Sequence, residues 1–235
     1  MEAFLTYKLT LFDLDYTLLP LDSDHAWGEF TTALGWTDAQ TFRQRNDAFY
    51  AAYQAGTLDI HDYVRFATAA VRAHGPQAAQ QAQARFLREV IEPAITPQAL
   101  ALVQAHQRAD DAVVVVTATN AFVTRPIAQR LGVDELIAVE LEQGADGWIT
   151  GEIRGTPSFR EGKVTRVHDW LRARGLDWSD AEISFYSDSM NDLPLLERAA
   201  HPVATNPDAR LRALAAARGW RILDLFTPEH KEETA

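Results

Sequence analysis

Two aspartates one residue apart follow an apolar run near the start of the sequence. The segment LTLFDLDYTLL places Asp13 and Asp15 at the end of residues 9–14, which we interpret as a buried strand. Two carboxylates this close repel each other and resist joint ionisation unless a cation or a proton compensates them. The pair therefore indicates a metal ion, a reaction, or both.

Further polar residues lie where an expected strand meets the next loop or helix. Thr117 ends the β-branched run AVVVV, Lys163 begins a helix in EGKVTRV, and Asp188 and Asp192 follow EISFYS. The carboxyl ends of parallel strands meet at one edge of a sheet, so these side chains should converge there. Carboxylates, a hydroxyl and a lysine suit phosphoryl chemistry, because magnesium binds few carboxylates together with phosphate oxygens.

Each of these residues alone also has an ordinary structural explanation. Asp-Leu-Asp is as consistent with a helix-capping turn as with catalysis, Thr117 is a common strand residue, and Asn120 is best interpreted as a helix cap. Lys163 could be a solvated helix charge, although the sequence has only three lysines among 22 basic residues. The joint order and placement of the residues favour the functional interpretation.

The elements that must position these residues alternate between strands and helices. Strands are expected at 9–14, 112–120, 182–188 and 201–206, with helices at 97–108, 162–174 and 191–200, and another from about 121 to 131 that is interrupted or restarted at Pro126. Residues 135–153 alternate around GADG and predict a β-hairpin. Alternating elements predict an α/β fold, a Rossmann-like parallel sheet core with right-handed crossovers.

An all-helical insertion is expected to divide this core. From about residue 22 to 92, apolar residues recur at helical spacing and predict four short helices without a strand, separated at Gly35, Gly56 and Gly75. We therefore predict a core domain of residues 1–20 and 94–235, and an inserted all-helical cap domain of residues 21–93. The cap should lie as a lid above the carboxyl ends of the strands. The last residues, PEHKEETA, are expected to fray.

Composition limits the classes of function. The 235-residue chain has a formal net charge of −11, which argues against nucleic acid as a partner. The absence of cysteine excludes disulfides and thiolate zinc sites. The first residues do not resemble a secretory signal, and no apolar run approaches the roughly 20 residues of a membrane span. These features predict a cytoplasmic protein with no membrane partner and leave its oligomeric state open.

The polar motifs, in this order, resemble those of the haloacid dehalogenase superfamily. The first is D-x-D-x-T at residues 13–17, the second an apolar strand ending at Thr117, the third Lys163, and the fourth YSDSMND with Asp188 and Asp192. The resemblance extends over nearly the whole chain. The helical insertion between the first two motifs is similar to the cap of the phosphoserine-phosphatase-like branch.

The resemblance implies a magnesium-dependent phosphatase that acts through an aspartyl-phosphate. Asp13 would be the nucleophile, and Asp15 would protonate the leaving alkoxide and then activate water. Branches that cleave carbon–halogen or carbon–phosphorus bonds lack an acid at this second position. Mg²⁺ would be held by Asp13, Asp188 and the Asp15 carbonyl, with Asp192 in support. Phosphate oxygens would be bound by Thr117, Lys163 and the main-chain N–H of Ala118.

The substrate is expected to be a small phosphate ester that bears an amine. Phosphoserine phosphatases carry a glutamate nine residues after the nucleophile, where this chain has Asp22, so an acid is retained. Their carboxylate-binding arginine aligns with Ala67, although Arg65 or Arg72 could replace it. We therefore expect histidinol phosphate first and phosphoserine second. The residues expected to contact the substrate are Asp22, Asp24 and Trp27, but Asp24 and Trp27 could equally organise the first cap helix.

Other functions remain open at this stage. A phosphotransferase would share the aspartyl-phosphate but pass the phosphoryl group to another acceptor. A receiver-like phosphoacceptor, which is not an enzyme, also combines acids, a threonine and a lysine, but it is about half as long and lacks a helical insertion. Turnover separates these classes, because a receiver keeps its phosphoryl group and a phosphatase loses it rapidly.

Overall fold

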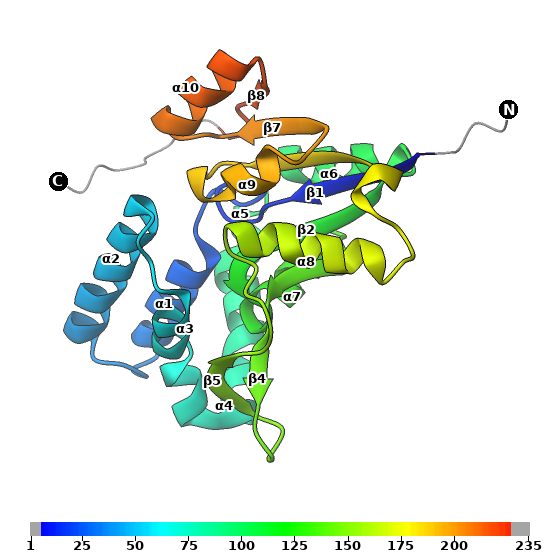
Figure 1. Cartoon of the computed structure of the whole chain (residues 1–235). Coiled ribbons are helices and arrows are strands. Elements are labelled where there is room, and N and C mark those ends of the chain that lie inside the picture. Colours follow the sequence, from blue (N-terminus) through cyan, green and yellow to red (C-terminus); the bar gives the residue numbers. More distant parts are fainter. Residues whose placement is uncertain (1–5, 227–235) are drawn as a thin grey trace, which may run out of the picture.

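Six parallel strands form the centre of the molecule (Figure 1). The computed structural model describes residues 6–226, and the sheet order is β3-β2-β1-β6-β7-β8. The strands are β1 (Tyr7–Phe12), β2 (Ala112–Asn120), β3 (Glu135–Val139), β6 (Ala181–Ser187), β7 (His201–Thr205) and β8 (Arg221–Leu223). The predicted α/β fold with a parallel sheet is confirmed. Because β1 pairs with both β2 and β6, the three strands that carry acidic or hydroxyl motifs are neighbours.

Helices cover both faces of the sheet, which explains continuous apolar runs in its strands such as residues 113–116 of β2. Helices α6 (Pro97–Arg108) and α7 (Ala121–Arg130) pack on the face that contains Phe12 and Val115. The opposite face, with Leu11 and Val116, is covered by α8 (Glu161–Arg172), α9 (Leu193–Leu196) and α10 (Ala209–Arg218). Alternate residues of one strand thus belong to two separate hydrophobic clusters.

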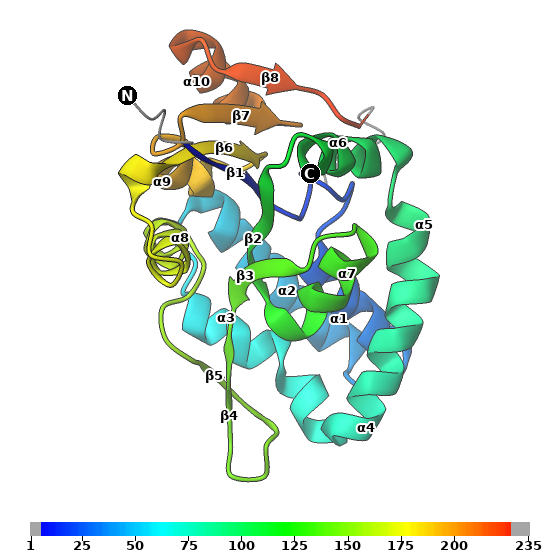
Figure 2. The ribbon, with the colours of Figure 1, turned by 90° about the vertical axis from the view of Figure 1, so that its right-hand side faces the viewer.

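The helical insertion lies beside the end of the sheet at which β1 finishes (Figures 1 and 2). It contains α1 (Ser23–Ala33), α2 (Ala39–Ala55), α3 (Ile60–Ala67) and α4 (Ala69–Phe86), followed by the π-helical turn η1 (Leu87–Ile91) and α5 (Glu92–Ala94). Residues 21–93 are all described and include no strand, as expected. Carboxylates of Asp22, Asp38 and Asp59 accept main-chain N–H groups at the starts of α1, α2 and α3. The division into two domains at the predicted boundaries stays a prediction.

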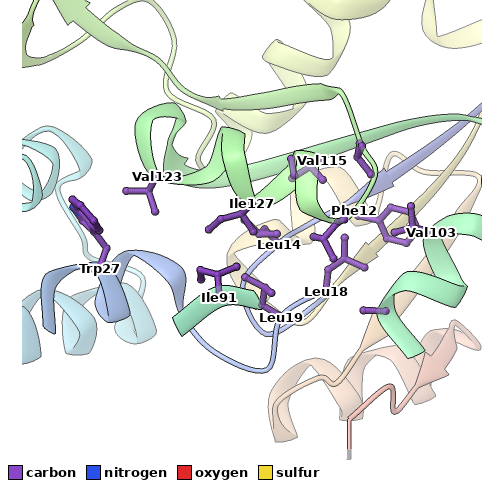
Figure 3. Close-up of a cluster of buried hydrophobic side chains, with 14 of the residues drawn as sticks. Phe12, Leu14, Leu18, Leu19, Trp27, Ile91, Val103, Val115, Val123 and Ile127 are labelled. Atoms are coloured by element: carbon purple, nitrogen blue, oxygen red, sulfur yellow. The ribbon is translucent and has the colours of Figure 1, made fainter. Parts of the chain in front are cut away.

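A hydrophobic cluster joins the insertion to the sheet (Figure 3). Phe12 at the end of β1 and Leu14, Leu18 and Leu19 in the loop after it are fully buried. Ile91 of the insertion packs in the same cluster. The loop after β1 is therefore fixed by packing from both sides, which is what a loop with catalytic side chains requires.

The prediction that Pro126 interrupts its helix was wrong, because α7 runs unbroken through this residue. Proline lacks the N–H that would bond to the carbonyl four residues earlier, here that of Phe122. The side-chain amide of Gln83, on α4, donates to this carbonyl instead. A residue of the insertion thus supplies the hydrogen bond that the proline removes.

The predicted hairpin is shorter than residues 135–153. Residues 141–143 (β4, Leu141–Gln143) and 149–153 (β5, Ile149–Ile153) form an antiparallel pair around the predicted turn, whereas β3 joins the main sheet in parallel to β2. The helix predicted after Asn191 is a 3₁₀ turn, η3 (Met190–Asp192), followed by the single turn α9. The predicted frayed tail lies outside the described residues. Among residues 6–226 no helix is long and apolar enough to cross a bilayer.

Candidate active site

A cavity of about 620 Å³ opens where the insertion faces the carboxyl ends of β1, β2 and β6. The structure brings most of the predicted site residues together in its wall. The core contributes Asp13, Asp15, Thr117, Ala118 and Asp188, and the insertion contributes Asp22 and Asp24. The convergence follows from the parallel sheet, since the three strands end at the same edge.

Asp13 continues the hydrogen-bond pattern of β1, because its N–H donates to the Tyr186 carbonyl of β6 at 2.9 Å. Its side chain is 9% exposed and lines the cavity. Burial raises the pKa of Asp13 to about 6, although the ammonium group of Lys163 opposes this shift. Burial likewise raises the pKa of Asp15 well above its ordinary value, with further repulsion from Asp22. The crowding inferred from the sequence is therefore present in the fold.

Lys163 is a buried cation that joins two of the predicted acids. Its Nζ donates to Asp13 Oδ1 at 2.8 Å and to Asp192 Oδ2 at 2.7 Å, and its side chain is only 2% exposed. Burial alone would lower its pKa, but the two carboxylates outweigh burial and raise it, so the charge is retained. Ser187 Oγ donates to the same Asp192 oxygen at 2.7 Å. Lys163 thus holds a fixed positive charge against Asp13.

The start of α8 positions Lys163 through a close backbone approach. A Cβ atom at Gly162 would lie 2.0 Å from the carbonyl oxygen of Pro157, so only glycine fits there. Arg160, the residue just before α8, has φ 52°, which is unusual for a residue other than glycine. This tight entry places Lys163 in the first turn of α8, where its Nζ reaches Asp13 after β1.

Both oxygens of the Asp15 carboxyl group are hydrogen-bonded. Oδ1 accepts the main-chain N–H of Ser23 at 2.9 Å, and Oδ2 accepts the hydroxyl of Thr119 at 2.9 Å. Our sequence analysis missed Thr119. A signal was present, because Thr119 is two residues after Thr117 on one strand and alternate strand residues share a face.

The donors around Asp13 suit a magnesium ion. Asp188 follows β6, and its Oδ1 accepts the Thr17 hydroxyl at 3.4 Å while its N–H donates to Thr17 Oγ1 at 3.1 Å. Within residues 6–226, no three acidic or histidine side chains form a metal-binding group. Magnesium requires less, since it commonly takes one or two carboxylates and completes its shell with water and phosphate oxygens. The carboxylates of Asp13 and Asp188 with the Asp15 carbonyl fit this requirement.

The predicted substrate-binding residues have different environments. Asp22 caps α1, where its Oδ1 accepts the N–H groups of Asp24 and His25 at 3.0 and 2.9 Å. Asp24 is 7% exposed, and burial raises its pKa to about 7, with repulsion from Asp22 adding to the shift and a hydrogen bond from Tyr63 opposing it. Asn120 caps α7 as predicted, and its Nδ2 also donates to Asp24 Oδ1 at 3.4 Å. The neighbours with most effect on the pKa of Asp24 include no cation.

The prediction that Trp27 contacts the substrate was wrong. Its side chain is 2% exposed and, among the described residues, it is not part of the cavity wall. The indole instead packs against Phe86 of α4 and Phe122 of α7, with ring centroids 5.3 and 5.9 Å away (Figure 3 shows Trp27 in the cluster). Trp27 therefore organises the insertion, which was the alternative left open by the sequence.

The arginines considered as substitutes for the missing one lie elsewhere. Arg65 pairs with Asp62 and Glu152 at 2.6 and 3.1 Å on the exposed surface, and Arg72 Nη2 donates to the Arg65 carbonyl at 3.0 Å. Of the described arginines, Arg160 and Arg210 line the cavity, and neither was predicted. Arg160 Nε donates to Asn191 Oδ1 at 3.2 Å. Nothing in local sequence distinguished these two, because their placement depends on the loops that surround the cavity.

Comparison with known proteins agrees with this geometry. A family model described as haloacid dehalogenase-like hydrolase matches residues 10–197. A protein of Neisseria meningitidis serogroup C named histidinol-phosphatase is 42% identical over 92% of this chain and 98% of its own length. A protein of Mycobacterium tuberculosis named phosphoserine phosphatase is 38% identical over 58% of this chain and 43% of its own length.

Solved structures show the same fold. A Bordetella pertussis Tohama I protein of unknown function superposes with a TM-score of 0.88 and 48% identity, over 94% of this chain and 100% of its own. A structure described as a phospho-aspartyl intermediate analogue of phosphoserine phosphatase gives a TM-score of 0.65 at 18% identity, over 94% of each chain. The chain therefore belongs to the haloacid dehalogenase-like hydrolases. Within that family it is a phosphatase.

Proposed function

We propose that this phosphatase hydrolyses a small phosphate monoester through a phosphoryl group carried on Asp13. The observation that supports this most directly is the meeting of Asp13, Asp15 and Thr117 in one cavity wall, with Lys163 bonded to Asp13. An oxygen of Asp13 attacks phosphorus as the ester P–O bond breaks, and Asp15 gives its proton to the departing alkoxide. Asp15 then takes a proton from water, which attacks the phospho-aspartate and releases phosphate.

The remaining core residues bind and position the phosphoryl group. We assign its oxygens to the Thr117 hydroxyl, the Ala118 N–H and Lys163. We further propose that Mg²⁺ is held by Asp13, Asp188 and the Asp15 carbonyl, with Asp192 in support through its contact with Lys163. Such an ion neutralises charge on the phosphoryl group and permits adjacent carboxylates to ionise together.

Histidinol phosphate is the proposed substrate, and the cytoplasm the proposed location. The relative that is 42% identical is named histidinol-phosphatase. Asp24 supports the same choice, because burial and repulsion from Asp22 raise its pKa, and a ligand with an ammonium or imidazolium group would compensate its charge. Asp22 adds negative charge beside it. Phosphoserine is the second candidate, because Arg160 in the cavity wall could pair with its carboxylate.

Phosphate release by the purified protein tests this proposal. Histidinol phosphate, phosphoserine and p-nitrophenyl phosphate are compared with MgCl₂ and with EDTA. We expect Mg²⁺-dependent turnover with the highest kcat/KM for histidinol phosphate, and no turnover by a folded Asp13→Asn variant. Faster hydrolysis of phosphoserine would reverse the order of substrates. Full activity of Asp13→Asn would exclude Asp13 as the nucleophile.

A further inference from the structure

The proton-transfer group Asp15 is held from two directions. The N–H that reaches its Oδ1 belongs to Ser23, the first residue of α1 in the insertion. The hydroxyl that reaches its Oδ2 belongs to Thr119, on β2 in the core. A carboxyl group bonded at both oxygens has little freedom to rotate about its own axis, so these two donors fix the plane in which it can deliver a proton.

Thr119 is well suited to this task. Its side chain is 7% exposed and lines the cavity, and its N–H donates to Thr117 Oγ1 at 3.1 Å, which ties it to a residue assigned to the phosphate. A β-branched side chain has few rotamers, so the hydroxyl stays where the strand places it. Thr117 and Thr119 both line the cavity, at the end of β2 where its pairing with β3 is irregular. One side chain can therefore bind phosphate oxygen while its neighbour orients the acid.

We infer that Thr119 is a positioning residue for Asp15: its hydroxyl, with the Ser23 N–H, aims the carboxyl group at the oxygen of the leaving group. The inference rests on the proposed function, in which Asp15 is the acid. A general acid must lie within hydrogen-bond reach of the atom that it protonates, and small displacements reduce the rate strongly. Thr119 itself exchanges no proton with the substrate.

The effect of Thr119 is measurable through the leaving group. The value of kcat/KM reports the steps up to departure of the alcohol, and p-nitrophenolate departs without a proton whereas an alkoxide does not. We expect Thr119→Val to reduce kcat/KM for the best alkyl phosphate by about tenfold or more, the range for one hydrogen bond to a charged group. The kcat/KM value for p-nitrophenyl phosphate should change less than about twofold. Thr119→Ser, which keeps a hydroxyl group, should restore kcat/KM for the alkyl phosphate.

A matched control separates this role from a structural one. Thr124 is also a buried threonine, and its hydroxyl donates to the Asn120 carbonyl at 3.0 Å without contacting Asp15. Thr124→Val should leave the ratio of the two kcat/KM values unchanged. In an Asp15→Asn background, Thr119→Val should cause no further loss, because residues that act through one another are not additive. Thr119→Ala, which removes both the hydroxyl and the methyl group, should repeat the Thr119→Val result if the valine prevents folding.

Two outcomes overturn the inference. If Thr119→Val lowers kcat/KM equally for both esters, Thr119 acts in phosphate binding or in folding. If both values are unchanged, its hydroxyl is dispensable. Different results would contradict the proposed function itself. These are an equal decrease of kcat/KM for both esters in Asp15→Asn alone, or no hydrolysis of either ester by the wild-type protein. If Asp15→Asn selectively impairs the alkyl ester and Thr119→Val does not, the proposed function stands and the inference about Thr119 falls.

Discussion

At the scale of single residues, the site is organised by how each buried charge is compensated. Lys163 lies between Asp13 and Asp192, so three charged groups share one water-poor space with a net charge near that of a single carboxylate. Removing the lysine would leave two buried acids unpaired, which is far more costly than losing a surface ion pair. Asp24 is the contrasting case, since burial and repulsion from Asp22 raise its pKa and only a hydrogen bond from Tyr63 opposes them.

Replacement of Asp24 by asparagine should stabilise the protein at alkaline pH. The pKa of Asp24 is raised from 3.8 to about 7, so the folded state holds its proton more tightly than the unfolded state. Its contribution to stability is therefore present below about pH 4 and is lost as the pH rises through about 7. Asp24→Asn should gain up to about 4 kcal/mol over wild type at pH 8, and little near pH 4.

Guanidinium unfolding at the two pH values measures this difference. The control is Asp47→Asn, an exposed carboxylate of α2 that should not change the pH dependence. The same Asp24→Asn protein should show a higher KM for histidinol phosphate, which would exemplify a binding group retained at a cost in stability. Parallel stability curves for wild type and Asp24→Asn would contradict the prediction.

At the scale of elements, Gln83 links α4 of the insertion to α7 of the core. It donates to the Phe122 carbonyl that Pro126 leaves without its helical partner. Gln83→Ala should therefore lower the free energy of unfolding by about 1–3 kcal/mol, because a buried acceptor loses its donor. In a Pro126→Ala background the helix can supply its own N–H, so the same substitution should cost clearly less.

Denaturant unfolding of the four proteins in this double-mutant cycle provides the test. The coupling energy between Gln83 and Pro126 should be favourable. The hydrogen bond from Gln83 is needed only when Pro126 removes the helical N–H. Gln107→Ala is a matched control, as Gln107 Nε2 donates to the Gly132 carbonyl at 2.7 Å, at a position without a proline. Strict additivity of Gln83→Ala and Pro126→Ala would refute the explanation given for the continuous helix.

The same elements show what sequence could and could not predict. The convergence of Asp13, Thr117 and Asp188 in one cavity wall could be predicted, because strand ends are visible as apolar runs and parallel strands end together. Trp27 was misassigned because helical spacing identifies a face but not the partner that covers it, here Phe86 and Phe122. The prediction at Pro126 was wrong for a related reason. The hydrogen bond that replaces the missing helical N–H comes from Gln83, which lies 43 positions earlier in the sequence.

At the scale of the whole molecule, an acidic chain concentrates carboxylates around one cavity. The net charge is −11, and six aspartates from the core and the insertion line this cavity. They are Asp13, Asp15, Asp22, Asp24, Asp188 and Asp208. A bound divalent cation would relieve the repulsion among the three nearest to the proposed metal position, and it would do so only in the folded state.

Mg²⁺ should therefore raise the melting temperature. At one hundred times its dissociation constant an ion adds about 2.7 kcal/mol, which corresponds to a shift of about 5–10 °C for a domain of this size. Thermal unfolding with MgCl₂ and with EDTA measures the shift without reference to activity. Asp188→Asn should abolish most of it, whereas Asp134→Asn, at an exposed position, should retain it. An undiminished shift in Asp188→Asn would place the ion elsewhere.

The central place of β1 in the sheet has a consequence for how the chain is made. Residues 7–12 are synthesised well before their neighbours in the sheet, which begin only at residues 112 and 181. Contacts so distant in sequence form slowly, and an unpaired apolar strand is prone to aggregate in the meantime. We expect the nascent chain to assemble its local helices early and to need protection of β1 until β6, which ends at Ser187, has been synthesised.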